Sequence, residues 1–213
     1  MDFKNQRKLK QSMVKNLKNT GIKNKRVLEV MSKVDRHKFV NKSYQHFSYE
    51  NEALPLVSGQ TISQPYTIAI MLEALAPKKG DKVLEVGTGS GYNAALLANL
   101  VYPGLIFTTE IVEELHNLAK SNLKDYPNVT VLLADGSLGL KEFAPFDKII
   151  VTAACPKIPE TLVNQLKNKG VLVAPVGKGL SQEMLRIENI NGEAKITNLG
   201  YFVFVPLKGK EGF

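Results

Sequence analysis

A glycine-rich segment with an acidic residue at its start carries the strongest chemical signal in this 213-residue sequence. It reads Glu85-Val86-Gly87-Thr88-Gly89-Ser90-Gly91 and separates a predicted strand over residues 82–87 from a predicted helix over 92–101. Alternating glycines allow the backbone to turn tightly and to approach a ligand without Cβ clashes. Ligands of open α/β sheets bind beyond the carboxyl ends of the strands, where this loop would lie. We therefore expect a ligand at Gly87, Thr88, Gly89, Ser90 and Gly91.

The loop differs from the dinucleotide fingerprint G-x-G-x-x-G, because Tyr92 stands where the third glycine belongs. Glu85 at the strand end would oppose the negative charge of a pyrophosphate, whereas it complements a cationic ligand. S-adenosylmethionine carries an amino group and a sulfonium centre and has no phosphate. The loop therefore favours S-adenosylmethionine, and a glycine-rich turn of purely structural purpose is the alternative.

Two further acidic residues end the next two predicted strands. Glu110 ends the strand over 105–110, and a carboxylate there can accept the hydrogen bonds of a ribose diol. Asp135, followed by Gly136, ends the strand over 129–135 and can accept a hydrogen bond from an adenine amino group. A single acid at a strand end is usually a cap or a turn former. Three acids that end three consecutive strands at one sheet edge indicate an adenosyl ligand.

The pattern of apolar residues predicts the elements that position these side chains. From residue 82 onward strands alternate with helices, which is typical of a doubly wound, mostly parallel α/β sheet. No helix separates the last two strands, and the turn signal Asn191-Gly192 lies between them, so we expect an antiparallel C-terminal hairpin. The other predicted helices cover 4–18, 24–33, 65–76, 112–126 and 159–168, and the other strands 147–154, 170–176, 184–190 and 199–207.

Composition bounds the class of protein. Hydrophobic residues make up 44% and charged residues 23%, as in ordinary globular proteins. No run of about 18 apolar residues predicts a membrane span, and the N-terminus lacks the apolar core of a secretory signal. Cys155 is the single cysteine, and no Cys/His spacing predicts a metal site, so we expect no metal and a cytoplasmic location.

We expect a monomer with a single domain over 1–213. Its parts would be N-terminal helices with an active-site loop (1–64), a cofactor-binding core (65–177) and C-terminal edge strands (178–213). Positive charge is concentrated in residues 1–42, which hold 13 Lys and Arg against three acids, within a net charge of +8. Such a segment can attract nucleic acid. We instead expect helices that pack on the sheet domain and expose a basic face.

The sequence as a whole resembles the protein-L-isoaspartate O-methyltransferase family from about Met13 to Leu207. The most specific segment is Gly59-Gln60-Thr61-Ile62-Ser63-Gln64-Pro65, which matches the signature preceding the cofactor loop in that family. Val34–Val40 is similar to an upstream family element, with Asp35 in place of proline. Further matching segments, in order, are Leu54–Leu56, Glu85–Tyr92, Asp135-Gly136, Ala144–Asp147, Val151–Ala154, Pro175–Gly177 and Phe204–Leu207.

The resemblance implies a Rossmann-like, class I S-adenosylmethionine-dependent methyltransferase that repairs damaged proteins. Its family transfers a methyl group from S-adenosylmethionine to the free α-carboxylate of L-isoaspartyl residues and releases S-adenosylhomocysteine. The implied partners are isoaspartyl-containing proteins and peptides, with no nucleic acid and no membrane. The alternatives are a methyltransferase of the same fold that acts on RNA, and a non-catalytic protein that binds an adenosyl ligand.

The resemblance also implies roles for single residues. An α-carboxylate has a pKa of about 3.5 and is already ionised at pH 7, so the reaction needs orientation rather than a strong base. Ser63 matches the family's active-site serine, and its hydroxyl and that of Thr61 can donate to the carboxylate. A helix start at Ser-Gln-Pro is the structural alternative for Ser63. The resemblance places Val205 and Pro206 in the peptide channel, and Gln64 and Gln182 at the cofactor.

Overall fold

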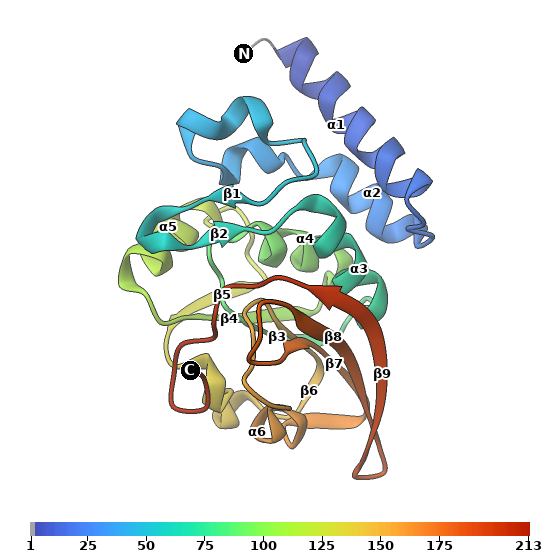
Figure 1. The fold of residues 1–213 in the computed structure, drawn as a ribbon, viewed down its shortest axis with the longest axis vertical. Helices are drawn as coiled ribbons and strands as arrows, with labels where there is room; N and C mark the ends of the chain where they lie inside the picture. The colour runs from blue at the N-terminus through green and yellow to red at the C-terminus, as the bar shows by residue number, and fades with distance from the viewer. Residues whose placement is uncertain (1–2) are drawn as a thin grey trace.

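The computed structural model describes residues 3–213 and contains a seven-stranded sheet in the order β5-β4-β3-β6-β7-β8-β9 (Figure 1). Strands β3 to β7 are parallel, whereas β8 pairs antiparallel with β7, and β9 antiparallel with β8. The strands are β3 (Lys82–Val86), β4 (Leu105–Glu110), β5 (Val129–Leu133), β6 (Phe146–Val151), β7 (Leu166–Val176), β8 (Gln182–Ile190) and β9 (Glu193–Phe202). This arrangement confirms the expected fold class, including the C-terminal hairpin.

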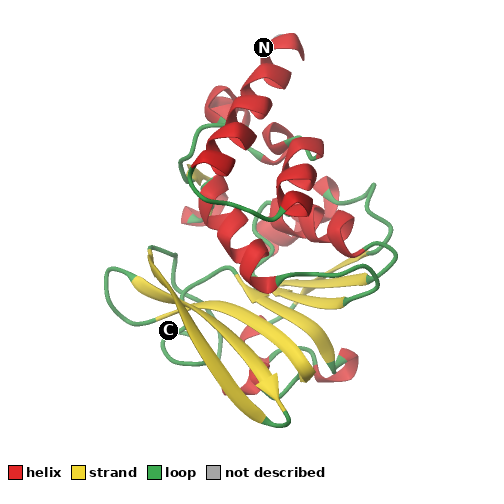
Figure 2. Cartoon of the chain, turned by 90° about the vertical axis from the view of Figure 1, so that its right-hand side faces the viewer, coloured by secondary structure: helices red, strands yellow, loops and turns green. Residues whose placement is uncertain are grey.

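Helices cover the two faces of the sheet unequally, and most of them gather on one side (Figure 2). Val83 and Leu84 are neighbours in β3 and point to opposite faces, and each belongs to a different hydrophobic cluster. The Val83 cluster includes side chains of α1 to α5, and the Leu84 cluster includes Leu162 of α6. The helices are α1 (Phe3–Asn19), α2 (Lys25–Lys33), α3 (Pro65–Leu75), α4 (Tyr92–Val101), α5 (Glu113–Asn122) and α6 (Glu160–Val163).

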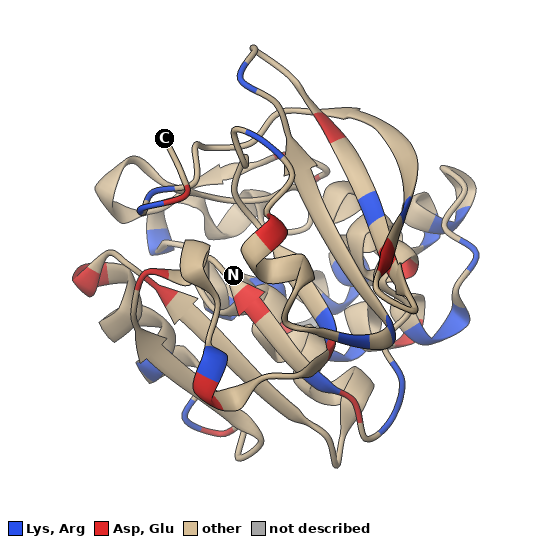
Figure 3. Cartoon of the chain, turned by 90° about the horizontal axis from the view of Figure 1, so that it is seen from below, with Lys and Arg blue, Asp and Glu red and all other residues tan. Residues whose placement is uncertain are grey.

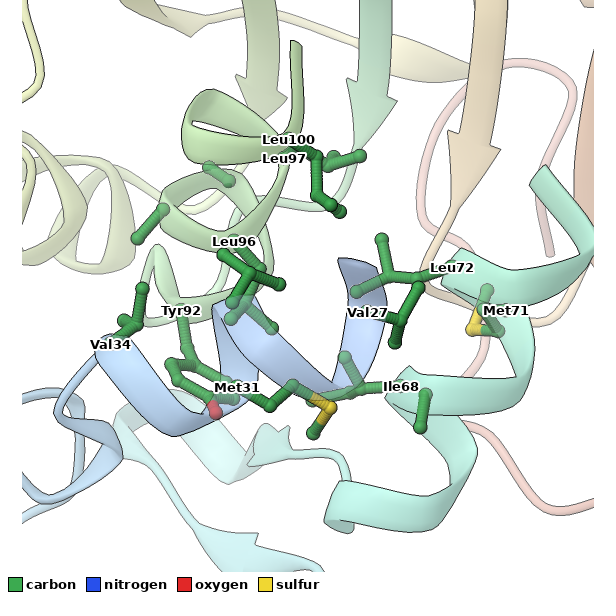
Figure 4. Close-up of a cluster of buried hydrophobic side chains, with 14 of the residues drawn as sticks. Val27, Met31, Val34, Ile68, Met71, Leu72, Tyr92, Leu96, Leu97 and Leu100 are labelled. Carbon is green, nitrogen blue, oxygen red and sulfur yellow. The ribbon is translucent and has the colours of Figure 1, made fainter. Parts of the chain in front are cut away.

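The basic N-terminal segment packs as helices on the sheet domain, as expected from its sequence. Val27 and Met31 of α2 lie in one buried cluster with Leu72 of α3 and Leu96 of α4 (Figure 4). Both α2 side chains are fully buried, whereas the Lys and Arg side chains of the same helix remain outside the cluster. In a view from below, segments with Lys and Arg and segments with Asp and Glu are both scattered over the chain (Figure 3). Within residues 3–213, no helix combines the length and apolar character needed to cross a membrane.

A short hairpin precedes the sheet and delivers the signature segment to it. β1 (Leu54–Pro55) pairs antiparallel with β2 (Thr61–Ile62), and Leu54 lies opposite Ile62. Pro65 occupies the first position of α3, where its missing N–H is not needed, so the helix begins directly after Ser63 and Gln64. The β1–β2 hairpin thus fixes the signature segment at Thr61 and Ile62, and the start of α3 fixes it at Pro65.

The predicted helix over 159–168 is wrong in its extent, because it shrinks to the four residues of α6. The chain enters β7 at Leu166, which lies opposite Phe146 of β6. The Gln165 side chain accepts a hydrogen bond from the backbone N–H of Leu140 at 2.8 Å. Pairing with a buried neighbouring strand therefore overrides the helical pattern of this segment.

The predicted strand over 199–207 is present but wrong in its bounds, since β9 begins at Glu193 and ends at Phe202. Beyond that point the Phe204 N–H donates to the Gln182 side chain at 2.9 Å, and Val205 accepts from the Ala154 N–H at 2.8 Å. These contacts turn the apolar run away from the hairpin and across the carboxyl ends of the parallel strands. Smaller differences are the earlier ends of α5, at Asn122, and of β5, at Leu133.

Candidate active site

Three adjoining cavities open at the carboxyl ends of the parallel strands. The loop cavity lies between the glycine-rich loop, the end of β4 and residues 205–208. The inner cavity lies between the same loop, the start of α4 and residues 61–63. The wide cleft, about 840 Å³ in volume, lies between α3 and residues 199–205. Thr61 and Thr152 line all three cavities and therefore mark the place where they meet.

The glycine-rich loop has a backbone that glycine adopts more easily than any other residue. Gly87, Gly89 and Gly91 have φ angles of 93°, 54° and 85°. A Cβ on Gly87 would collide with Oγ1 of Thr152, and one on Gly91 would collide with the Leu123 side chain. Gly87 and Gly89 line the loop and inner cavities, so these cavities meet bare backbone. The buried side chains of Thr88 and Ser90 line the inner cavity.

Glu110 lies at the end of β4 and lines the loop cavity. Its Oε2 accepts a hydrogen bond from the N–H of Gly89 at 2.9 Å, and its Oε1 accepts from Ile111 and Val112 at 2.9 and 3.0 Å. The carboxylate is therefore fixed from both sides and ties the loop to β4. A fixed acceptor at a cavity wall suits the diol of a ribose.

Glu85 lies beneath the loop, fully buried, and lines none of the three cavities. Its carboxylate accepts hydrogen bonds from Asn93 Nδ2 at 2.7 Å and from the hydroxyl of Thr108. Burial raises the pKa of Glu85 to about 7, although the hydrogen bonds from Thr108 and Asn93 oppose this effect. The sequence predicted that Glu85 contacts the ligand. In the structure Glu85 contacts Asn93 instead, and Asn93 lines the inner cavity.

The signature segment places two hydroxyl groups between the cavities. Thr61 ends the turn of the β1–β2 hairpin, and Ser63 lines the inner cavity and the wide cleft. Within residues 3–213, neither hydroxyl has a hydrogen-bond partner in the protein, so both can donate to a ligand. Gln64, which we expected at the cofactor, lines the wide cleft instead of the loop cavity.

Asp135 and Gly136 follow β5 at the far wall of the loop cavity. Gly136 lines the cavity, and a Cβ there would collide with Thr109. The carboxylate of Asp135 accepts from Ser137 Oγ at 2.6 Å and from the Lys210 N–H at 2.8 Å. The structure thus places Gly136 at the cavity and turns the Asp135 carboxylate toward the C-terminal segment, so its contact with adenine stays a prediction.

The segment after β9 closes the site. Val205 and Pro206 line the loop cavity, and Val205 also lines the wide cleft. Gln182 is buried outside the three cavities, where it accepts from the Phe204 N–H at 2.9 Å and donates to the Gly179 carbonyl at 2.8 Å. Gln182 therefore anchors the segment that forms the wall.

Two residues at the centre of the site carried no role in the sequence prediction. Thr152 follows β6 and donates through Oγ1 to the Gly87 carbonyl at 2.6 Å. Asn93, the second residue of α4, lines the inner cavity and donates a hydrogen bond to Glu85. Thr152 belongs to a segment that matches the family, which was the available signal, whereas Asn93 becomes visible only through its contact with Glu85.

The site residues fit an adenosyl ligand with a cationic amino acid portion. The glycines keep Cβ atoms out of the cavities, and Glu110 supplies a fixed carboxylate. Among residues 3–213, the buried Oδ1 atom of Asn93 has no hydrogen-bond donor. Within residues 3–213, no group of three or more His, Cys, Asp or Glu side chains could hold a metal ion. This fold with this site defines an S-adenosylmethionine-dependent methyltransferase of class I.

Comparison with known proteins identifies the family within this class. The chain belongs to the Protein-L-isoaspartate(D-aspartate) O-methyltransferase (PCMT) family, whose profile matches residues 7–212. A protein-L-isoaspartate O-methyltransferase from Dictyoglomus turgidum is 48% identical over 206 residues, which are 96% of this chain and 93% of the relative. One from Methanosarcina mazei is 47% identical over 210 residues, covering 97% of this chain and 86% of the relative.

Two solved structures agree with this assignment. The structure of a protein-L-isoaspartate O-methyltransferase superposes with a TM-score of 0.87 at 29% identity, covering 95% of this chain and 67% of the other. A family member from Plasmodium falciparum, solved with S-adenosyl-L-homocysteine, has a TM-score of 0.83 at 28% identity, covering 92% and 97% of the two chains. The family expected from the sequence is thereby confirmed. The Plasmodium falciparum relative holds S-adenosyl-L-homocysteine, the product form of the expected cofactor.

Proposed function

We propose that this chain transfers the methyl group of S-adenosylmethionine to the free α-carboxylate of L-isoaspartyl residues in proteins and peptides. The observation that carries the proposal is the junction of cavities at Thr61 and Thr152. A cofactor held by the glycine-rich loop and Glu110 would meet there a peptide held in the wide cleft. Ser63 lies between the inner cavity and the cleft, next to this junction.

The chemistry requires placement rather than proton transfer. The α-carboxylate of an isoaspartyl residue, with a pKa of about 3.5, is ionised at pH 7 and is itself the nucleophile. Its oxygen forms a bond to the methyl carbon while the carbon–sulfur bond breaks and its electron pair goes to sulfur. The products are a methyl ester and S-adenosylhomocysteine. S-adenosylmethionine supplies an activated methyl group on a sulfonium centre, and the protein supplies in-line geometry.

Ser63 and Thr61 are proposed to hold this carboxylate by donating their free hydroxyls to its oxygens. A hydrogen bond between a hydroxyl and a carboxylate is charge-assisted and directional. The 11-residue helix α3 begins two residues after Ser63, at Pro65, and its N-terminus favours an anion nearby. Helix start and carboxylate ligand are therefore compatible roles for Ser63.

The wide cleft has the character of a peptide site. Its lining side chains carry no formal charge. Tyr66 and Tyr201 lie on opposite walls, on α3 and β9. Aromatic and apolar walls exclude water around the reacting carboxylate and so strengthen the hydrogen bonds to it. Val205 and Pro206 are proposed to separate this channel from the cofactor.

The test is incubation with methyl-labelled S-adenosylmethionine and two peptides that differ only in an aspartyl or isoaspartyl linkage. We expect base-labile label in the isoaspartyl peptide alone. Equal labelling of both peptides would refute the proposed specificity. Labelling of RNA with no labelling of either peptide would favour the alternative methyltransferase function.

We also propose that the protein is a monomer in the cytoplasm. Cys155, the single cysteine, is buried, and burial raises the pKa of its thiol to about 12, so it is poorly suited to form an intermolecular disulfide. Light scattering on the purified protein tests the monomeric state, and fractionation of the source cells tests the location.

A further inference from the structure

Asn93 combines burial with an unused hydrogen-bond acceptor. The residue is 8% exposed and lines the inner cavity together with Ser63 and the glycine-rich loop. Its Oδ1 atom is buried and has no hydrogen-bond partner within the described chain. Buried side-chain acceptors in folded proteins are nearly always paired, so this atom points to a partner that binds from outside the chain.

The orientation of the Asn93 amide follows from Glu85. In the structure the NH2 group of Asn93 donates to Oε1 of Glu85 at 2.7 Å. Thr108 donates to the other carboxylate oxygen and keeps the acid in place. With its nitrogen committed to Glu85, the amide must turn its oxygen elsewhere.

The inner cavity selects the chemistry of that partner. Its lining side chains carry no formal charge, and the carboxyl group of Glu85 lies directly behind Asn93. A positively charged donor bound at Asn93 favours the ionised form of the Glu85 carboxyl group behind it, so the pair favours a cationic donor. S-adenosylmethionine offers one such donor, the α-ammonium group of its methionine portion.

We propose that Asn93 Oδ1 accepts a hydrogen bond from the α-ammonium group of the cofactor, and that Glu85 acts through Asn93 as a positioning residue. This inference rests on the proposed cofactor site and goes beyond it by naming the group that recognises the amino acid portion. Glu85 would then stabilise a cationic ligand through Asn93, without contacting the ligand itself.

The test compares three ligands by calorimetry on the unaltered protein and on Asn93→Ala. S-adenosylhomocysteine carries both the ammonium and the carboxylate, S-adenosyl-3-thiopropylamine carries only the ammonium, and 5′-methylthioadenosine carries neither. We expect Asn93→Ala to weaken the first two ligands about tenfold, as for one lost hydrogen bond to a charged group, and to leave the third unchanged. Asn99→Ala is the matched control, because Asn99 lies on the same helix, is exposed and donates to the Ala95 carbonyl away from the cavity.

Each other outcome contradicts the inference in a recognisable way. Equal weakening of all three ligands would show that Asn93 only supports the loop. Weakening of S-adenosylhomocysteine without weakening of the thiopropylamine would assign Asn93 to the carboxylate instead. Should Asn93→Ala fail to fold, Asn93→Ser gives the same comparison with a smaller change. Failure of the unaltered protein to bind S-adenosylhomocysteine would refute the cofactor site itself.

Discussion

The hydroxyl of Thr152 donates to the carbonyl of Gly87 and occupies the space that a Cβ on Gly87 would need. One residue after β6 thus fixes the first glycine of the loop that follows β3, the neighbouring strand. The same threonine lines all three cavities. Thr152 therefore both fixes the first glycine of the loop and lies at the junction of the cavities.

Replacement of Thr152 by Val should weaken the binding of S-adenosylhomocysteine about fivefold to tenfold. Valine keeps the shape of the side chain but removes the donor to Gly87, and such a hydrogen bond contributes about 1 kcal/mol. Thr152→Ser should restore most of the affinity, because it keeps the hydroxyl. Calorimetry measures both, with the exposed Thr130→Val on β5 as the control. Equal affinity of the Val and Ser variants would show that the hydrogen bond is not what holds the loop.

Replacement of Ser63 by Ala should lower kcat/KM for an isoaspartyl peptide while leaving the affinity for S-adenosylhomocysteine unchanged. The proposed loss is one hydrogen bond to a charged carboxylate, about 1.5–3 kcal/mol, which corresponds to a loss of roughly 10- to 150-fold. Initial rates give the first quantity and calorimetry the second. Ser32→Ala on α2 is the control, because Ser32 is exposed and far along the chain from the site. Full activity of Ser63→Ala would show that Ser63 does not contribute to catalysis.

Replacement of Glu110 by Gln should weaken cofactor binding at least tenfold. The carboxylate accepts from Gly89 through one oxygen and from Ile111 and Val112 through the other. Glutamine replaces one of these oxygens with an NH2 group, so at least one backbone N–H loses its acceptor, and the ribose loses an anionic partner. Calorimetry with S-adenosylhomocysteine measures the effect, and circular dichroism checks the fold. Glu113→Gln, at an exposed position on α5, should change neither.

The glycine-rich loop and Glu110 could be predicted from the sequence because short local patterns identify them. Positive φ angles at Gly87 and Gly89 require glycine, and a carboxylate ending a buried strand is conspicuous in the sequence. The mostly parallel sheet was accessible for a similar reason, since both of its faces are covered and its strands read as apolar runs.

Contacts between distant segments were not accessible in the same way. The sequence shows that Glu85 ends a strand, but not that Asn93 and Thr108 bury it beneath the loop. It shows an acid at Asp135, but not that the Lys210 backbone would bind that acid. The helix expected over 159–168 failed because a strand partner, Phe146, competes for Leu166. In each case tertiary pairing decided between options that the local sequence left open.

The pH dependence of folding stability should report the buried carboxyl group of Glu85. Its pKa rises from 4.5 to about 7 in the folded protein, so the folded state binds its proton more tightly than the unfolded state does. The contribution of Glu85 to stability is therefore fully present below pH 4.5 and is lost as the pH rises to 7. At pH 8 the loss amounts to about 3 kcal/mol, at 1.36 kcal/mol for each pH unit.

Replacement of Glu85 by Gln removes this titration, since glutamine stays neutral and can still bond Asn93 and Thr108. We expect the free energy of unfolding of Glu85→Gln, relative to the unaltered protein, to increase steadily between pH 4.5 and 7 and to level off above pH 7. Urea unfolding at a series of pH values gives this difference. Taking the difference also cancels the contribution of His37, whose pKa is lowered by burial and whose effect on stability runs in the opposite direction. A difference that stays flat from pH 4.5 to 8 would show that Glu85 remains ionised across this range in both states.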